Sequence, residues 1–301
     1  MGSQIHVVVN PAAGQPEPVL HALNQVFQGA DADWTVSVTH EPGDAMRQAR
    51  EAVERGVDVV AAYGGDGTVM EVANGLMGSD VPLAILPGGT GNVLSIELGI
   101  PQELERAAGL ACREGAEVRR VDVGQCGERY FLLRLGVGFT AEQINLTSRE
   151  LRDRYGRLAY FIAGLQALPQ AEAVRYRFTL DGQEVEVEGA TCLVCNAGSI
   201  GVPGLALMPD IQIDDGLLDV VVLEAVNLQA LPTLAASVAG LSLDLEGLGH
   251  WQAREIMVDS DPAQSVVVDG EPWGKTPCPV KVLPGAVAVL TPIQSPLVAE
   301  D

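Results

Sequence analysis

The sequence predicts an α/β domain followed by a β-rich domain, and two patterns indicate this fold class. In the first part of the chain, short apolar runs alternate with segments of helical periodicity, which is typical of a parallel sheet covered by helices on both faces. From about Val118–Gly124 onward the apolar runs alternate more often and Asp-Gly pairs separate several of them. Such pairs are typical of antiparallel hairpins, so we expect a mostly antiparallel sandwich or barrel there.

The α/β part is assigned element by element from the period of its apolar residues. The predicted strands are Ile5–Val9, Trp34–Thr39, Val57–Tyr63 and Pro82–Leu86. The predicted helices are Val19–Phe27, Ala45–Arg55 and Val69–Met77. The run Val57–Tyr63 is apolar throughout, as expected of a strand that is buried on both faces.

The β-rich part is assigned in the same way. The predicted strands are Tyr130–Leu135, Val174–Leu180, Glu184–Val187, Thr191–Cys195, Leu217–Leu223, Glu255–Val258, Ser265–Val268, Val280–Val282 and Ala286–Leu290. Two segments of helical pattern, Ala141–Leu168 and Leu228–Leu245, interrupt them. We expect the functional site in the cleft between the two domains.

Composition excludes several classes of protein. The chain has 301 residues and a formal net charge of −22, which argues against nucleic-acid binding and against a polybasic membrane anchor. No apolar run approaches the roughly 20 residues that span a bilayer, and no signal peptide is evident, so we expect a cytoplasmic protein. The 5 cysteines are scattered. Cys192 and Cys195 lie in an apolar strand pattern, which favours buried structural thiols over a redox or metal pair.

Two glycine-rich turns follow two successive predicted strands. Val57–Tyr63 runs into Gly64-Gly65-Asp66-Gly67-Thr68, and a helix is expected directly behind this turn. Pro82–Leu86 runs into Pro87-Gly88-Gly89-Thr90-Gly91-Asn92. Main-chain amides bared by glycine, together with a helix N-terminus, favour a bound phosphate. A single such turn is as often a plain connection, but two in succession favour function; neither matches a Walker A loop or a GxGxxG fingerprint.

Six motifs in order resemble the bacterial lipid kinases of the diacylglycerol kinase catalytic family, to which sphingosine and ceramide kinases look similar. They are Asn10-Pro11-x-x-Gly14, the segment from Gly64 to Gly75, Pro87–Asn92, Val121–Gly124, Pro209–Asp219 and Asp269-Gly270-Glu271. The resemblance implies an α/β nucleotide domain over residues 1–122 and a β-sandwich lipid-acceptor domain over 123–301, with a return of the last residues to the first domain left open. It also implies transfer of the γ-phosphoryl group of ATP to a hydroxyl of diacylglycerol or a related lipid, with Mg²⁺.

The resemblance also implies site residues. The ATP site would consist of Asn10, Gly14, Thr39, Gly64, Gly65, Asp66, Gly67, Thr68, Val69, Met70 and Thr90. Asp66 would lie beside the phosphates and a Mg²⁺ ion that offsets its charge; the alternative is a carboxylate that only stabilises its turn. Glu271 would be the general base; without the resemblance, an exposed turn acid is the simpler interpretation. A structural cation would bind Asp215 and the main-chain carbonyls of Gln212 and Leu217, although Asp-Asp-Gly is also an ordinary turn.

Two positions depart from the family pattern. Val93 stands where many relatives have Asp, and Met70 stands where Asn is common, so metal and nucleotide contacts could differ there. Apart from these, the strongest local feature is a cluster of arginines, Arg149, Arg152, Arg154 and Arg157. It fits either anionic lipid headgroups or a solvated helix face that pairs with neighbouring acids.

Three functions are therefore compared. The first is a lipid kinase that makes transient contact with the membrane. The second is a soluble-metabolite kinase of the NAD-kinase type, which would have a polar cleft. The third is a catalytically silent lipid-binding or nucleotide-binding protein, which Val93 and Met70 would suit. The motifs in Pro209–Asp219 favour the first, and the sequence leaves open whether the protein forms a homodimer.

Overall fold

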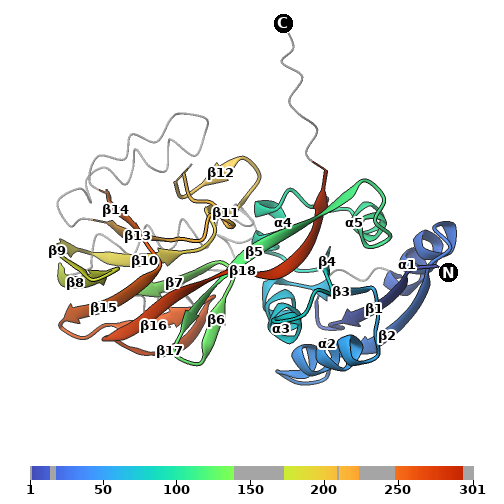
Figure 1. Cartoon of the computed structure of the whole chain (residues 1–301), viewed down its shortest axis with the longest axis horizontal. Coiled ribbons are helices and arrows are strands. Elements are labelled where there is room, and N and C mark those ends of the chain that lie inside the picture. The colour runs from blue at the N-terminus through green and yellow to red at the C-terminus, as the bar shows by residue number, and fades with distance from the viewer. Residues whose placement is uncertain (1, 14–17, 139–172, 209, 224–247, 294–301) are drawn as a thin grey trace, which may run out of the picture. The chain divides into compact units, whose positions relative to one another are not determined.

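The computed structural model describes residues 2–13, 18–138, 173–208, 210–223 and 248–293. The chain divides into two compact units (Figure 1). Unit 1 comprises Met1–Val121 and Gly285–Asp301, and unit 2 comprises Asp122–Pro284. Two long strands, β5 (Ala116–Cys126) and β18 (Cys278–Pro292), therefore contribute residues to both units.

Unit 1 is built on a parallel sheet. Its strands are β1 (Gln4–Val9), β2 (Asp33–Val38), β3 (Val59–Gly64), β4 (Leu83–Pro87) and the last part of β18. They lie in the order β2-β1-β3-β4-β18, and every pair is parallel. Both β3 and β4 are buried along their whole length, as continuous apolar strands in a parallel sheet should be.

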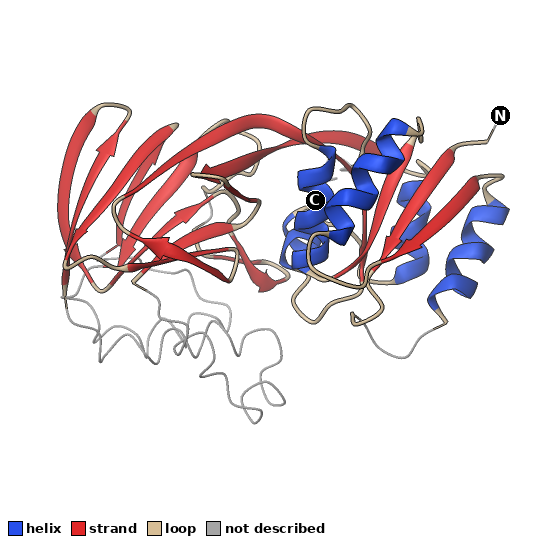
Figure 2. Cartoon of the chain, turned by 90° about the horizontal axis from the view of Figure 1, so that it is seen from below, coloured by secondary structure: helices blue, strands red, loops and turns tan. Residues whose placement is uncertain are grey.

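Helices cover both faces of this sheet (Figure 2). The helix α2 (Asp44–Glu54) packs along α3 (Asp66–Leu76), and α1 (Val19–Gly29) packs along α5 (Leu104–Ala111). Gly75 allows α2 and α3 to approach closely, because a β-carbon there would lie 2.5 Å from the Met46 carbonyl oxygen. A short helix, α4 (Val93–Glu97), follows β4.

The strand order reverses between β1 and β3, which is the topological switch point where open α/β sheets have their ligand crevice. After β1 the chain moves outward to β2, whereas after β3 it moves in the opposite direction to β4. The segments that leave β1 and β3 therefore diverge, and the carboxyl ends of these two strands form the position where open α/β sheets bind ligands. Asn10 follows β1 at this edge, and Gly65 follows β3.

Unit 2 is an antiparallel β-sandwich. One sheet has the order β14-β13-β10-β7-β16-β17 and the other continues from β18 through β15 and β8 to β9. The strands of the first sheet are β14 (Leu248–Ala253), β13 (Leu218–Leu223), β10 (Thr191–Cys195), β7 (Arg134–Val137), β16 (Ser265–Val268) and β17 (Glu271–Lys275). The second contains β15 (Glu255–Asp261), β8 (Val174–Leu180) and β9 (Gln183–Gly189). Phe178 and Trp251 pack between the sheets with ring centroids 6.2 Å apart.

The predicted fold class is confirmed, with several differences in detail. The predicted strand Tyr130–Leu135 is divided into β6 (Arg129–Phe131) and β7, and the predicted strands Val280–Val282 and Ala286–Leu290 are parts of the single strand β18. The elements α4, α5, β5, β14 and β17 were not predicted, and neither were β11 (Ser199–Val202) and β12 (Leu205–Ala206). The two predicted helical inserts and the arginine cluster lie outside the described residues. Among the residues described, every helix is too short or too polar to cross a bilayer.

Candidate functional site

Four segments that follow the strands of unit 1 lie side by side at the carboxyl edge of its sheet. Main-chain hydrogen bonds join them in sheet order: Thr39 N–H to Val9 C=O (2.9 Å), Asn10 N–H to Tyr63 C=O (3.0 Å) and Gly88 N–H to Gly64 C=O (2.9 Å). Residues from four separate parts of the predicted nucleotide site therefore come together. Gly14 lies outside the described residues.

The two glycine-rich turns are in direct contact. A β-carbon on Gly89 would lie 2.5 Å from the Gly65 α-carbon, and a β-carbon on Gly64 would lie 2.5 Å from the Thr68 β-carbon. Glycine is therefore required at Gly64 and Gly89 by the packing of the loops themselves. Gly67 differs, since a β-carbon there would meet nothing within 4 Å. Its position faces open space at the start of α3.

Asn10 bridges the crevice between β1 and β3. Its side-chain Nδ2 donates to the Thr68 Oγ1 at 2.9 Å, and its Oδ1 accepts the Ala12 N–H at 3.0 Å. Thr68 is buried and belongs to the first turn of α3. The Asn10 amide thus fixes the hydroxyl of Thr68 relative to the loop after β1.

Asp66 connects the two glycine-rich turns. Its Oδ1 accepts the main-chain N–H of Leu94 at 3.1 Å, which places the carboxylate at the N-terminus of α4. In the second turn, Asn92 adopts a left-handed conformation with φ 48°, and its Oδ1 accepts the Gly89 N–H at 2.9 Å. Asp66 therefore has a structural role, as the alternative interpretation expected, but the amide it binds belongs to α4, which follows the other turn.

The N-terminus of α3 is built without a capping side chain. Its N-cap residue is Gly65, which makes no side-chain cap, and the first helical hydrogen bond runs from Val69 N–H to Gly65 C=O at 3.1 Å. The first-turn amides and the positive end of the helix dipole consequently face the crevice. Met70 is half-buried one turn into the helix, and Thr90 is exposed.

Glu271 lies in unit 2, at the start of β17. It pairs with Val268 of β16 across a two-residue turn, and its side chain is exposed. The turn residues Asp269 and Gly270 have φ angles of 44° and 89°, as a type I′ hairpin turn requires. Both the general base and the exposed turn acid proposed from the sequence are compatible with this position.

Asp269, which the sequence analysis placed in a turn and in the Asp-Gly-Glu motif without a role of its own, is held by main-chain amides. Its carboxylate accepts the N–H groups of Leu132 (3.0 Å), Leu133 (3.2 Å) and Arg134 (2.8 Å). Burial of the carboxyl raises its pKa to about 6, against the opposing effect of these amides and of the Arg134 charge. Its place in the Asp-Gly-Glu motif marked the position, but the sequence does not indicate the three amides that it binds.

The predicted cation site lies in a loop crowded with carboxylates. Asp215 Oδ1 accepts the Leu217 N–H at 2.9 Å, and Asp122 Oδ2 accepts the Gly216 N–H at 2.6 Å. Burial raises the pKa of Asp215, and the negative charges of Asp219, Asp122 and Asp214 raise it further. Within the described ranges, no group of three or more His, Cys, Asp or Glu side chains could hold a metal. A cation at Asp215 would therefore need the main-chain carbonyls that the resemblance implies.

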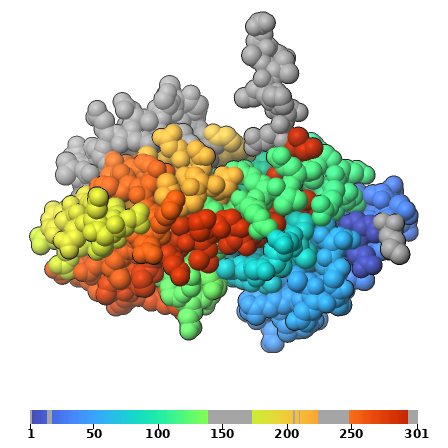
Figure 3. Space-filling model, viewed as in Figure 1, coloured from blue at the N-terminus to red at the C-terminus, as the bar shows by residue number. Residues whose placement is uncertain are grey.

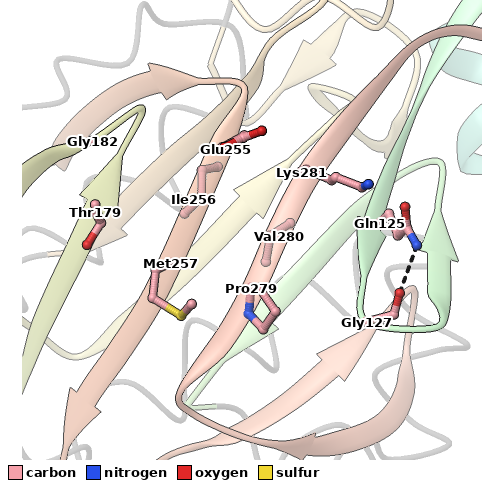
Figure 4. A pocket seen from close by; sticks show the side chains of 10 residues that line it. All are labelled: Gln125, Gly127, Thr179, Gly182, Glu255, Ile256, Met257, Pro279, Val280 and Lys281. Carbon is pink, nitrogen blue, oxygen red and sulfur yellow. Dashed lines mark hydrogen bonds between the residues drawn. The ribbon is translucent and has the colours of Figure 1, made fainter.

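Two open grooves lie away from these residues. The groove in unit 2 has a volume of about 610 Å³ and is lined by Gln125, Gly127, Thr179, Gly182, Glu255, Ile256, Met257, Pro279, Val280 and Lys281 (Figure 4). It lies on the outer face of β15 and β18, and the neighbouring β8–β9 hairpin is the yellow region of Figure 3. The groove in unit 1, of about 680 Å³, lies between α1 and α5. Neither groove is lined by a predicted site residue.

Comparison with known proteins gives consistent matches for both units. Residues 4–126 match the diacylglycerol kinase catalytic domain, and residues 135–291 match the YegS C-terminal NAD kinase beta sandwich-like domain. The chain is 30% identical to the diacylglycerol kinase of Bacillus subtilis, with 90% of each protein covered. It is 34% identical to a probable lipid kinase YegS-like of Pseudomonas aeruginosa, with 90% of this chain and 89% of that protein covered. A crystal structure of a putative diacylglycerol kinase from Bacillus anthracis superposes with a TM-score of 0.83, at 30% identity and 96% coverage of both chains.

Proposed function

This chain belongs to the diacylglycerol kinase catalytic-domain family, and from that premise we propose that it transfers the γ-phosphoryl group of ATP to a hydroxyl of diacylglycerol or a related lipid. One observation carries the proposal beyond the family: the two glycine-rich turns touch at Gly65 and Gly89, beside the crevice between β1 and β3. Main-chain amides and a helix N-terminus there form a cradle suited to a chain of phosphates.

The nucleotide would bind along the carboxyl edge of unit 1. The first-turn amides of α3 would donate to the phosphate oxygens, and Gly67 leaves room for the phosphate to approach the main chain. Asn10, Thr39 and Thr90 would add polar contacts from the neighbouring loops. Their side chains are neutral, so they bring no charge that repels the triphosphate.

Asp66 would lie beside the phosphates as an acidic residue that needs a cation. Mg²⁺, when bound with the nucleotide, supplies the positive charge that offsets the phosphates during transfer. Asp66 would fit this role because its Oδ1 accepts the Leu94 N–H, and its Oδ2 would bind a metal-bound water or the metal itself. The residue would then both join the two turns and hold the metal.

Glu271 would act as the general base. Its carboxylate would accept the proton of the lipid hydroxyl while the hydroxyl oxygen attacks the γ-phosphorus. The bond between the γ-phosphorus and the bridging oxygen breaks, and ADP leaves. A lipid acceptor implies transient contact with a membrane surface.

A second cation would stabilise the loop around Asp215. Burial and then the neighbouring carboxylates raise the pKa of Asp215, and a bound divalent cation would offset the repulsion between these carboxylates. The ligands would be the Asp215 carboxylate with the carbonyls of Gln212 and Leu217, a set of hard oxygens suited to Mg²⁺ or Ca²⁺. This cation would support unit 2 and take no part in phosphoryl transfer.

The function is tested by incubating the protein with γ-labelled ATP, Mg²⁺ and a mixed lipid extract. Label in the organic phase is the expected result, and it identifies a lipid as acceptor. Label confined to water-soluble products would indicate a metabolite kinase instead. Binding of ATP or lipid without any transfer would indicate a silent binding protein.

Two variants and a matched control make the assay specific to the proposed residues. Glu271→Gln removes the base but keeps the shape of its side chain, and Asp66→Asn keeps an acceptor for Leu94 while removing the charge. Glu184→Gln makes the same change as the first at an exposed position of β9. We expect organic label to fall in the first two variants and to be unchanged in the third.

A further inference from the structure

Two hairpin turns of unit 2 are held in the same way, by the carboxylate of an aspartate in the turn. In the β8–β9 hairpin, Asp181 and Gly182 have φ angles of 47° and 86°, and the Asp181 carboxylate accepts the N–H groups of Arg254 and Glu255. In the β16–β17 hairpin, Asp269 and Gly270 repeat this conformation, and Asp269 accepts three N–H groups. In both, the first turn residue ties its hairpin to a separate segment of chain. Only the second hairpin carries Glu271.

The segment that Asp269 binds is fixed from its other side as well. Asn196 Nδ2 donates to the Leu132 carbonyl at 2.9 Å, and the main-chain N–H groups of Asn196 and Ala197 donate to the Leu133 carbonyl at 2.9 and 3.1 Å. Asn196 is fully buried, and Leu132 is almost so. The amides that face Asp269 therefore belong to a rigid platform, and the turn that they hold is located accurately.

We infer that Asp269 is a positioning residue, whose carboxylate locks the β16–β17 turn onto residues 132–134 and thereby fixes the location of Glu271. The inference rests on the proposed role of Glu271 as base. Glu271 is separated from Asp269 by Gly270 alone, and its side chain is exposed. Because such a side chain has few contacts of its own, the main chain of the turn must set its position.

The lock depends on the charge of Asp269. An ionised carboxylate accepts all three N–H groups, whereas a protonated one turns one oxygen into a donor. The charged group of the platform that faces it is the Arg134 guanidinium, which is itself bonded to the Ser199 carbonyl, and Glu271 is the neighbouring acid on the hairpin. Burial raises the pKa of Asp269 to about 6, so at pH 7.5 the carboxylate is ionised and can accept all three N–H groups.

The test compares Asp269→Asn with Asp181→Asn, which makes the same change in the matching turn. We expect kcat of the Asp269 variant to fall about 10- to 100-fold at pH 7.5, the loss typical of a displaced catalytic group, with KM for ATP unchanged. Asp181→Asn should retain the wild-type kcat. Equal losses in the two variants, or a loss in Asp269→Asn that appears in KM for ATP and leaves kcat unchanged, would overturn the inference.

A structural measurement separates this inference from the proposed function. We expect the amides of Leu132, Leu133 and Arg134 to exchange with deuterium faster in Asp269→Asn than in the wild type at the same pH. Unchanged protection in the variant would refute the lock. An inactive wild-type protein with the expected exchange would refute the kinase proposal and the role of Glu271 while leaving the lock itself established.

Discussion

The side chain of Asp66 shows how one residue can serve both folding and chemistry. Asp66 lies in the first glycine-rich turn. Its carboxylate accepts the N–H of Leu94, which follows the second glycine-rich turn in the chain. From the sequence, a turn-stabilising residue and a phosphate-site residue are alternative interpretations of Asp66. The geometry makes them compatible, because the bond that joins the turns also holds the carboxylate beside them.

The two roles can be separated by substitution. Asp66→Ala removes the acceptor for the Leu94 N–H, and we expect it to lower the free energy of unfolding by about 1 kcal/mol, as loss of a helix cap does. Asp66→Asn keeps an acceptor oxygen and should unfold at nearly the wild-type urea concentration. Both variants should lose phosphoryl transfer. Full transfer by Asp66→Asn would show that the charge of Asp66 is not needed.

His6 is a second residue whose environment has a measurable consequence. It is buried in β1, with Nδ1 2.8 Å from the Thr35 Oγ1 and Nε2 2.9 Å from the Ser37 Oγ. Burial, assisted by the nearby Arg55 charge, lowers the pKa of His6 to about 4. Between about pH 4 and 6.5 the unfolded chain therefore holds a proton at this site that the folded chain lacks. The contribution of His6 to the free energy of unfolding therefore rises with pH between about 4 and 6.5. It is lost as the pH falls through this range.

We expect His6→Gln to remove this dependence. Going from pH 6.5 to 4.5, the wild type should lose more unfolding free energy than the variant, by at most about 3 kcal/mol. Urea unfolding at several pH values measures the difference, and His21→Gln, at an exposed position of α1, is the control. Asp269 acts in the opposite direction, because its raised pKa makes stability fall with rising pH between about 4 and 6. The wild type itself therefore has a pH-dependent unfolding free energy with contributions from several groups. The pH dependence of each variant must be compared with that of the wild type.

At the scale of elements, the contact between the two glycine-rich turns determines the geometry of the site. We expect Gly89→Ala to destabilise unit 1, because its new methyl group would lie 2.5 Å from the Gly65 α-carbon. Gly67→Ala meets no protein atom within 4 Å and should leave the urea midpoint unchanged or slightly raised, since alanine favours helix. If phosphate binds at the start of α3, Gly67→Ala should still weaken ATP binding in calorimetry. Unchanged affinity would place the phosphates elsewhere.

The same scale shows what the sequence could predict. The elements β1, β3, β4 and α3 were predictable from their apolar patterns and from the turn residues that follow them, Asn10-Pro11 after β1 and glycine after the others. The break between β6 and β7 was not, because Leu132 and Leu133 are apolar residues whose amides leave the strand ladder to bind Asp269, which follows more than 130 positions later. The helix α5 was missed because its alanines give a weak apolar pattern. The residues of the glycine-rich turns were identified from motifs, but the partner of Asp66 depends on tertiary contact.

At the scale of the whole molecule, net charge governs how the protein would meet its lipid. The chain carries a formal charge of −22 and belongs to a lipid kinase family. An anionic membrane would repel such a protein at low ionic strength, and salt would screen that repulsion. The Debye length falls from about 30 Å at 0.01 M to about 8 Å at 0.15 M.

We therefore expect salt to increase activity on anionic membranes. With diacylglycerol in vesicles of anionic phospholipid, the initial rate should rise several-fold as sodium chloride increases from about 0.01 to 0.15 M at constant Mg²⁺, following the shorter screening length. With zwitterionic vesicles, which do not repel the protein, the rate should change little. A rate that falls with salt on anionic vesicles would contradict repulsion by the net charge. It would instead favour the interpretation of Arg149, Arg152, Arg154 and Arg157 as a surface that attracts lipid headgroups.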